Sequence, residues 1–445
     1  MSLSSKSSTR RMTFKSLLNK ALFRPRPGLA LVCLTLSWSQ LGWAINYGIY
    51  DPRALAMGGA TVAAGDTQNA HFYNPALLSF HDEDEDLTQD GRFIMPGILV
   101  LSSEGGKAAK DLIEDDMVEG ITDSIDRYNA NPADEQAQQG LLRAMADIND
   151  VMRDMDEQPI ELELFTGLSV SEPAEREGGS FYLGLRAIVF GEADVTDDDL
   201  ALMEDYEEAA RFISSNGTEG ELHPELYNGT ALVDPRPQLD SEAEVSSLAI
   251  SEWGIAMAKE FSVFSYPVSF GFTPKIVQAE VYRDSMNFQD EVPSYNDNKK
   301  THLTMNFDLG VAAEVYDNVR VGFAIRDVME KTFKSQNDLE INLEPRMRLG
   351  VAYVNNWLTV GMDIDAKKNK PIATEEDNQE FALGVDVRPW ESVSFRAGYR
   401  QNFAGESDDV MSFGVRYSVW RLEMEAAYAV SDDVEGGALQ LGVRF

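Results

Sequence analysis

The stretch from 411 to 419, MSFGVRYSV, decides the fold of this chain. Its apolar residues alternate with Ser, Gly and Arg, and the same period of two returns at 303–315 and 439–445. A period of two places alternate side chains on opposite faces of a β-strand. A water-soluble sandwich would also alternate. Here, however, the second face carries tiny residues and charges, as in a barrel with lipid outside and a polar lumen. We therefore predict an all-β membrane protein, an antiparallel transmembrane β-barrel.

Residues 92–445 supply enough such segments to close a barrel. Bacterial outer-membrane barrels have an even number of strands, and about fourteen segments have the pattern of strands. They are 92–102, 160–170, 181–190, 242–261, 266–285, 301–315, 318–328, 344–355, 357–366, 379–388, 392–402, 408–419, 421–431 and 436–445. No uninterrupted apolar run is long enough for a membrane-spanning helix.

Two long insertions, 103–159 and 193–241, interrupt the barrel sequence. In the first, Leu141, Met145, Ile148 and Met152 recur at three-to-four spacing, which predicts helix. The second begins with an acidic helix from 197 to 215 and ends in a proline-rich stretch. Both are too long for turns, so we expect helical insertions at one rim of the barrel.

The connections between the later segments alternate between very short and longer ones. Trp357, Trp390 and Trp420 stand beside three of the short turns. In outer-membrane barrels the short turns lie on the periplasmic side, the long loops outside, and aromatic girdles at both interfaces. We therefore expect both termini in the periplasm and both insertions on the extracellular side.

The N-terminus, 1–44, has the features of a secretory signal. A basic region without acids precedes an apolar core at 28–38, and Gly42-Trp43-Ala44 offers small residues for cleavage after Ala44. A twin-arginine signal at Arg10-Arg11 is less favoured because the following residues fit it poorly. Export would remove Cys33, the one cysteine, so the mature chain is expected to have no thiol. These features predict the outer membrane of a Gram-negative cell.

The composition excludes several classes of function. A formal net charge of −37 makes nucleic acid an improbable direct partner. The acidity indicates either solvated loops or divalent-cation bridging to lipopolysaccharide, and the acidic run 81–86 is better interpreted as a linker than as a calcium loop. The sequence lacks a G-x-S-x-G elbow, a P-loop and an H-E-x-x-H motif, and no two of its four histidines have metal-ligand spacing. We expect no enzyme activity, no cofactor and no metal.

Residues 45–91 form a compact segment before the first strand. Arg53 to Ala64 is rich in small residues and predicts a short helix broken at Gly58-Gly59. Asn74-Pro75 is a turn or helix-start signal, with Asn as the cap and Pro in the first helical position. The segment is too apolar for a free tail and too glycine-rich for a strand.

This segment carries a resemblance to a known family. An R-x-x-A-M-G-G-A motif, 53–60, is followed by N-P-A-L, 74–77, and then by a barrel. Together they resemble the fatty-acid-transporter (FadL-like) superfamily of outer-membrane proteins and, within it, the conjugal transfer TraF-like family. The unrelated thioredoxin-like TraF is excluded by the cysteine-free mature chain. The resemblance implies a plug inside the barrel, built around Arg53, Met57, Gly58, Gly59, Asn74, Pro75 and Ala76.

Alternation also predicts which side chains face the lumen. The candidates for a lumen or substrate path are Tyr182, Arg186, Ile188, Phe190, Arg326, Arg348, Arg396 and Arg416. Charges there must be paired or hydrated, so we expect an ion-pair network that anchors the plug, with a substrate path as the alternative. The apolar members on the third strand are compatible with a greasy pocket. Gly184 and Gly191 leave open a kink or bulge in that strand.

Two functions follow as hypotheses. The first is an outer-membrane envelope component, as the TraF-like resemblance implies, with its acidic insertions facing partner proteins and its barrel embedded among lipid and lipopolysaccharide. The second is a transporter of hydrophobic small molecules of the long-chain fatty-acid type. It requires a cavity near Tyr182, Ile188 and Phe190.

Overall fold

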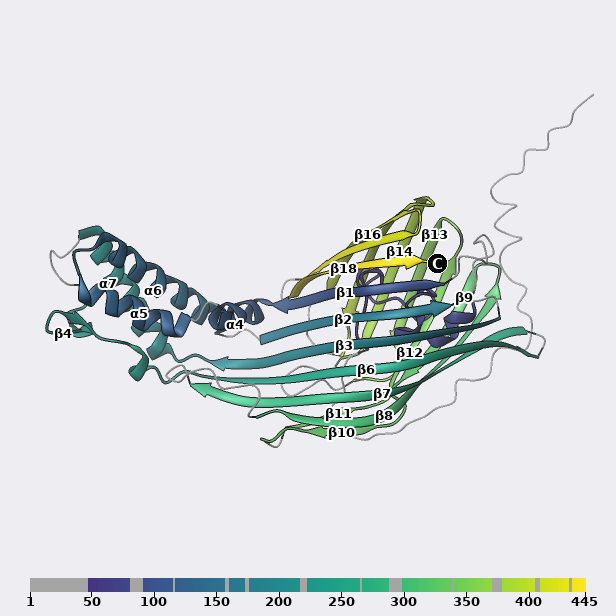
Figure 1. Cartoon of the computed structure of the whole chain (residues 1–445), viewed down its shortest axis with the longest axis horizontal. Helices are drawn as coiled ribbons and strands as arrows, with labels where there is room; N and C mark the ends of the chain where they lie inside the picture. The colour runs from purple at the N-terminus through teal and green to yellow at the C-terminus, as the bar shows by residue number, and fades with distance from the viewer. Residues whose placement is uncertain are drawn as a thin grey trace, which may run out of the picture. The chain divides into compact units, whose positions relative to one another are not determined.

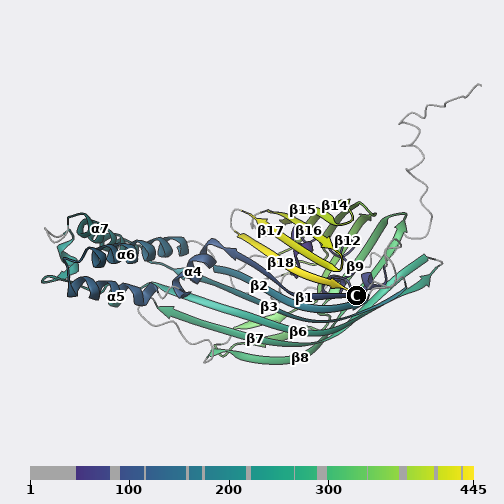
Figure 2. The same ribbon diagram turned by 45° about the horizontal axis from the view of Figure 1, so that its top comes forward.

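The computed structural model describes residues 47–80, 91–114, 117–156, 160–172, 176–216, 222–264, 266–287, 298–337, 339–369, 378–404, 409–431 and 434–445. They belong to one compact unit, Gly42–Phe445. The expected signal peptide, 1–44, and the acidic run 81–86 lie outside the described residues. Figures 1 and 2 show the unit from two directions.

Fourteen of the described strands form a closed antiparallel barrel, which confirms the predicted fold class. Each strand pairs with its neighbours in the chain, and β1 closes the ring by pairing with β18. The strands are β1 Arg92–Ser103, β2 Ile160–Glu172, β3 Glu177–Asp194, β6 Glu242–Val263, β7 Tyr266–Asn287, β8 Lys300–Tyr316, β9 Val319–Arg326, β12 Arg346–Val354, β13 Leu358–Asp365, β14 Glu380–Trp390, β15 Val393–Asn402, β16 Val410–Val419, β17 Leu422–Val430 and β18 Val434–Arg444.

The apolar face of the strands points out of the barrel. The exposed fraction is 71% for Leu303, 56% for Met411 and 66% for Leu439. It is 1% for Ser412, which follows Met411 and points inward. An apolar exterior of this extent is unfavourable in water and is stabilised by lipid, which is the arrangement of a transmembrane barrel. No helix in the described part of the chain is both long and apolar enough to cross a membrane.

The two ends of the barrel differ. One end carries the short turns, such as those after β8, β12, β14 and β16, and there Trp357, Trp390 and Trp420 are all exposed. The chain end also lies here, because the amide of Phe445 donates to the carbonyl of Gly91 at 3.0 Å. The other end carries the long connections, and β6 and β7, each of 22 residues, extend toward it (Figure 1).

Both insertions consist mainly of helix, with short strands in the second. The first contains α4 Glu104–Glu114, α5 Met117–Ala130 and α6 Glu135–Met155, and the second contains α7 Asp197–Asn216, η3 Pro224–Leu226, β4 Tyr227–Asn228, β5 Ala231–Leu232 and η4 Arg236–Gln238. Helix α6 starts where the Asp134 side chain accepts from the amide of Gln136, leaving Leu141, Met145 and Met152 on its buried face. Figure 1 shows α5, α6 and α7 side by side.

The two insertions form one helical unit, which we define as 104–155 together with 197–239. Met145 and Met152 of α6 share a single apolar core with Met203 and Tyr206 of α7. Polar contacts join the insertions as well, for example Asn149 Nδ2 to a Glu207 carboxylate oxygen at 2.7 Å. The helices were predicted from the sequence, whereas this common core was not.

The connection between β9 and β12 differs from the loop expected there. It forms a hairpin of β10 Lys331–Lys334 and β11 Glu340–Leu343. Phe333, Ile341 and Leu343 are buried against inward-facing side chains of β6 and β7, in one apolar cluster with Val277. These few apolar residues stand among polar ones, so their burial depends on the apolar lumen wall opposite them.

The outward face predicts a depth-dependent response to charge. Val415→Arg, in the middle of β16, is expected to lower the free energy of unfolding by about 2–4 kcal/mol. Val419→Arg, on the same face beside the turn, should lower it by about 0–1 kcal/mol. The readout is the urea dependence of the folded band on unboiled gels of the two variants in liposomes. Equal small effects would mean that this face does not contact the hydrocarbon core.

Candidate functional site

Residues 47–80 lie inside the barrel, visible as the purple ribbon in Figure 1. This N-terminal segment contains α2 Pro52–Ala56, α3 Ala70–Tyr73 and η1 Pro75–Ser79, and nearly all of its side chains are buried. Helix α2 ends before Gly58 and Gly59, whose φ angles of +64° and +92° favour glycine. The Asn74 side chain caps η1 by accepting from the Ala76 amide at 3.1 Å.

A belt of inward-facing glycines seats this segment against the barrel wall. A Cβ at Gly271 would lie 2.2 Å from the Ala76 amide nitrogen, and one at Gly398 would lie 2.1 Å from that of Gly58. Several of these glycines face each other across paired strands, for example Gly384 and Gly398. The members are Gly271, Gly310, Gly322, Gly350, Gly361, Gly384, Gly398 and Gly414. The small residues on the inward face therefore leave the space that the backbone of the N-terminal segment occupies.

Polar anchors fix the segment directly after its first motif and at its second motif. Asp363 on β13 accepts the amides of Thr61 and Val62 at 2.6 and 2.8 Å. The Asn74 amide group donates to the carbonyl of Val62 at 2.8 Å and to that of Val311 on β8 at 3.3 Å. Asn74 thus joins the two halves of the segment to each other and to the wall.

Arg53 links the segment to the barrel as well. Its guanidinium donates to the Ala64 carbonyl at 2.9 Å and lies 3.4 Å from Asp66 and 3.5 Å from Asp386 on β14. Burial alone would raise the pKa of Asp66, but the Arg53 charge and the Gln68 amide lower it to about 2. Met57 is buried beside Gly384, and Pro75 beside Gly271 and Gly310.

The predicted lumen arginines are all buried or partly buried, and each has a carboxylate partner. Arg186 pairs with Glu163 at 2.8 Å, Arg348 with Asp365 and Glu380 at 2.5 and 2.6 Å, Arg396 with Glu425 at 2.8 Å, and Arg416 with Glu423 at 3.4 Å. Arg326 lies 3.3 Å from Glu252 and 4.4 Å from the ring centre of Tyr50. The geometry is that of an ion-pair network contacting the N-terminal segment.

The centre of this network is Lys275 on β7, which is not among the residues predicted to face the lumen. Its ammonium lies 3.1 Å from Glu252, 3.0 Å from Asp308 and 2.7 Å from Asp327, and its side chain is fully buried. Asp327 in turn pairs with Arg346. The available signal was the single Lys on the inward face of 266–285, between outward Phe272 and Ile276.

The structure separates the three apolar lumen candidates. Tyr182 stacks on His71 at 4.9 Å and meets Phe72 edge-on at 5.0 Å, in an aromatic cluster that also contains Tyr50 and Phe165. Phe190 and Ile188 belong instead to the cluster covered by the β10–β11 hairpin. The expected greasy pocket is therefore filled by protein side chains.

A small cavity remains beside the aromatic cluster. It is lined by Tyr50, Phe72, Phe165, Gly184, Arg186, Ile250, Glu252 and Arg346 and measures about 10 Å³, room for roughly one water molecule. Nε2 of His71 and the Tyr182 hydroxyl, in the neighbouring aromatic cluster, are also buried without a hydrogen-bond partner among the described residues, although neither residue lines this cavity. The space suits a water molecule and is too small for a hydrocarbon chain.

The third strand is continuous. Between 177 and 194 the register of β3 with β6 runs without a shift, and its register with β2 is likewise unbroken. A shift occurs instead in β1, where Met95 and Pro96 are both exposed and one extra residue opposes β2 and β18. Proline has no amide hydrogen to donate to a neighbouring strand, which suits it to such a bulge.

Lys275 yields a prediction about lumen stability. Lys275→Met removes the cation shared by three buried carboxylates and is expected to cost roughly 3–5 kcal/mol, because the remaining charges stay enclosed. Lys259→Met breaks the exposed pair with Glu177, 3.1 Å apart, and should cost at most about 1 kcal/mol. Urea titration of the folded, heat-modifiable band compares them. A loss from Lys275→Met no larger than from Lys259→Met would show that water solvates the cluster.

His71 yields a prediction about pH. Burial, and secondarily the Arg326 charge, lowers the pKa of His71 to about 3. An unfolded histidine takes up a proton below about 6.5, so docking of the segment weakens as pH falls from about 6.5 toward 3. Proteolysis of 47–80 should accelerate over this range in the wild type and less in His71→Phe. Identical pH profiles would contradict a neutral, buried ring.

The sequence matches one family model, and the fold is similar to those of solved structures. A family model described as "F plasmid transfer operon, TraF, protein" matches residues 71–365. The chain is similar to the Pseudomonas putida toluene transporter TodX at 10% identity and a TM-score of 0.45, covering 89% of this chain and 98% of that chain. The chain is also similar to a Pseudomonas aeruginosa FadL homologue, at 11% sequence identity and a TM-score of 0.45, covering 91% of this chain and 99% of that chain. No curated protein matches the sequence.

Proposed function

The chain belongs to the family described as "F plasmid transfer operon, TraF, protein", and we propose that it is a closed outer-membrane barrel serving plasmid transfer as an envelope component. In this role the barrel anchors the protein in the membrane and the helical unit contacts a partner. The observation that carries the proposal is the helical unit itself, in which two separate insertions build one apolar core. A loop that only connected strands would not need such a core.

The orientation of the barrel supports the same role. Short turns, exposed tryptophans and the chain end share one rim, as expected on the periplasmic side. The helical unit is attached to the opposite rim and would face the outside of the cell. Its surface is acidic, with Asp197 and Asp198 exposed in the first turn of α7, which favours a cationic protein or cation-bridged lipopolysaccharide over nucleic acid.

The lumen supports a structural role over an open pore. The N-terminal segment is held by the carboxylate of Asp363 and by the glycine belt, and the β10–β11 hairpin covers the apolar wall beyond it. These contacts are the packing of a protein interior, and the lumen arginines in them pair with carboxylates. We propose no catalytic role for these residues.

Transport of hydrophobic small molecules is the second candidate. One observation favours it, namely that part of the lumen wall is apolar: Phe190, Leu248, Ile250, Val277 and Val281 face inward under the hairpin. Displacement of the hairpin would uncover a surface suited to a fatty acid or hydrocarbon. The candidate therefore requires the hairpin to move.

Two deletion variants separate the candidates, one without the helical unit and one without the β10–β11 hairpin. Ser102 pairs with Leu162 and Asp194 pairs with Glu242, so short glycine-containing turns can replace 104–159 and 195–241 without altering the barrel register. We expect the variant that lacks both insertions to assemble as a heat-modifiable barrel while plasmid transfer from donor cells falls at least tenfold. The matched variant replaces 331–343 by a turn, and its transfer frequency should stay at the wild-type level.

The same strains test the alternative. If transport is the function, the hairpin deletion changes uptake of a fluorescent long-chain fatty acid, and the insertion deletion leaves plasmid transfer unchanged. That pair of results would overturn the envelope-component proposal.

A further inference from the structure

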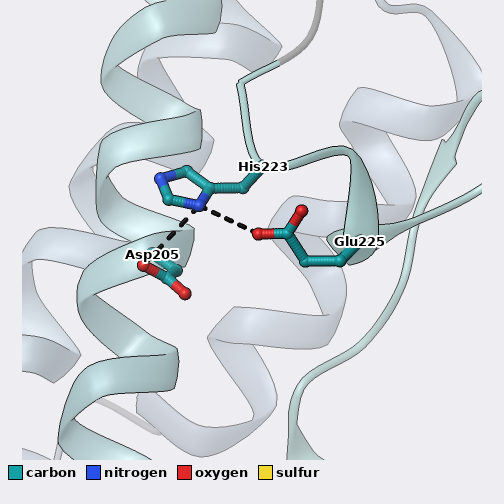
Figure 3. A group of neighbouring side chains, drawn as sticks. All are labelled: Asp205, His223 and Glu225. Atoms are coloured by element: carbon teal, nitrogen blue, oxygen red, sulfur yellow. Dashed lines mark hydrogen bonds and ion pairs between the residues drawn. The ribbon is translucent and has the colours of Figure 1, made fainter.

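A second cluster of polar side chains lies far from the lumen, in the helical unit. Asp205 projects from α7, and His223 and Glu225 come from the segment that returns toward the barrel (Figure 3). Nδ1 of His223 is 3.1 Å from a Glu225 carboxylate oxygen and 3.6 Å from one of Asp205. One ligand atom from each of the three residues lies within 4.8 Å of the other two.

These separations match the first shell of a bound metal. Zinc binds histidine nitrogen and carboxylate oxygen at about 2.0–2.2 Å in tetrahedral geometry, which places neighbouring ligand atoms ~3.3–3.5 Å apart. The two measured separations fall on either side of that value. The donors can therefore reach one ion with small side-chain rotations.

The other ring nitrogen points to the same chemistry. Nε2 of His223 lies 3.2 Å from a carboxylate oxygen of Glu208, one turn further along α7. In the neutral tautomer that donates Nε2–H to Glu208, the Nδ1 lone pair can bind an ion shared with Glu225 and Asp205, in the place that a proton on Nδ1 takes in the hydrogen bond to Glu225. A carboxylate on the far nitrogen is the usual support of a metal-bound histidine, because it holds the tautomer and the ring orientation.

The cluster is built on a fixed framework. Tyr206, next to Asp205, is fully buried and donates its hydroxyl to the Val233 carbonyl at 2.8 Å. Leu226, next to Glu225, is buried in the same core of the helical unit. The spacing between α7 and the returning segment is thus set by packing and does not depend on the ion.

We infer that Asp205, His223 and Glu225 bind one divalent transition-metal ion of the zinc class, with Glu208 orienting the histidine. An imidazole nitrogen among the donors favours zinc over calcium and magnesium, which prefer oxygen ligands throughout. Three protein ligands leave a coordination position for water or for a group of another molecule. The sequence predicts no metal because no two histidines have ligand spacing, whereas these ligands are one histidine and two carboxylates.

The test measures zinc binding to the full mature protein, untagged, in detergent, after removal of metals with a chelator. Isothermal titration should show one zinc per chain, with calcium and magnesium at least tenfold weaker. His223→Asn and Asp205→Asn should each weaken zinc binding at least tenfold, and asparagine tolerates the left-handed backbone at 223, where φ is +59°. The matched control is Glu204→Gln, which removes one acid from α7 beside the site and should bind as the wild type does.

Three results would overturn the inference. They are equal zinc affinity in the wild type and His223→Asn, an equal loss in Glu204→Gln, and the absence of saturable zinc binding to the wild type. Cobalt substitution gives an independent readout, since a tetrahedral site produces visible absorption that His223→Asn should abolish. Circular dichroism and gel mobility confirm that each variant keeps its helices and its barrel.

Discussion

Every charge enclosed by this barrel needs a partner inside it, and the rest of the structure depends on that requirement. Burying a lone carboxylate or ammonium is prohibitive, so charges in a lumen occur in satisfied groups. Lys275 is surrounded by three carboxylates, and Asp363 accepts two backbone amides from the N-terminal segment. The segment is therefore part of the barrel's polar interior, because it supplies donors that the strands alone do not.

The strands could be predicted from the sequence because the membrane imposes their period. Lipid on one face and a polar lumen on the other force alternation, and the fourteen strands appear within a few residues of the expected bounds. The ends of the barrel were readable from connection length and from Trp357, Trp390 and Trp420 for the same reason. Alternation predicts which face of the sheet a side chain occupies, but it does not predict which residues that side chain contacts.

What could not be predicted depends on contacts across space. The glycine belt has single members spread along eight strands and emerges only when the register aligns Gly322 with Gly350 or Gly384 with Gly398. The β10–β11 hairpin has too few apolar residues to signal burial until the wall around Val277 is in place. His223 has no metal-ligand spacing to another histidine, and its carboxylate neighbour Asp205 is brought to it by the core of the helical unit.

The common core of the two insertions has a mechanical consequence for the barrel. A strand in a closed sheet can slip past its neighbour by two residues and keep its side chains on the same faces, so alternation alone does not lock the shear. The first insertion joins β1 to β2 and the second joins β3 to β6, and their helices pack on each other above these four strands. A slip between β2 and β3 would pull that core apart. The helical unit thus opposes such a slip in this part of the barrel, in addition to the backbone pairing that sets the register.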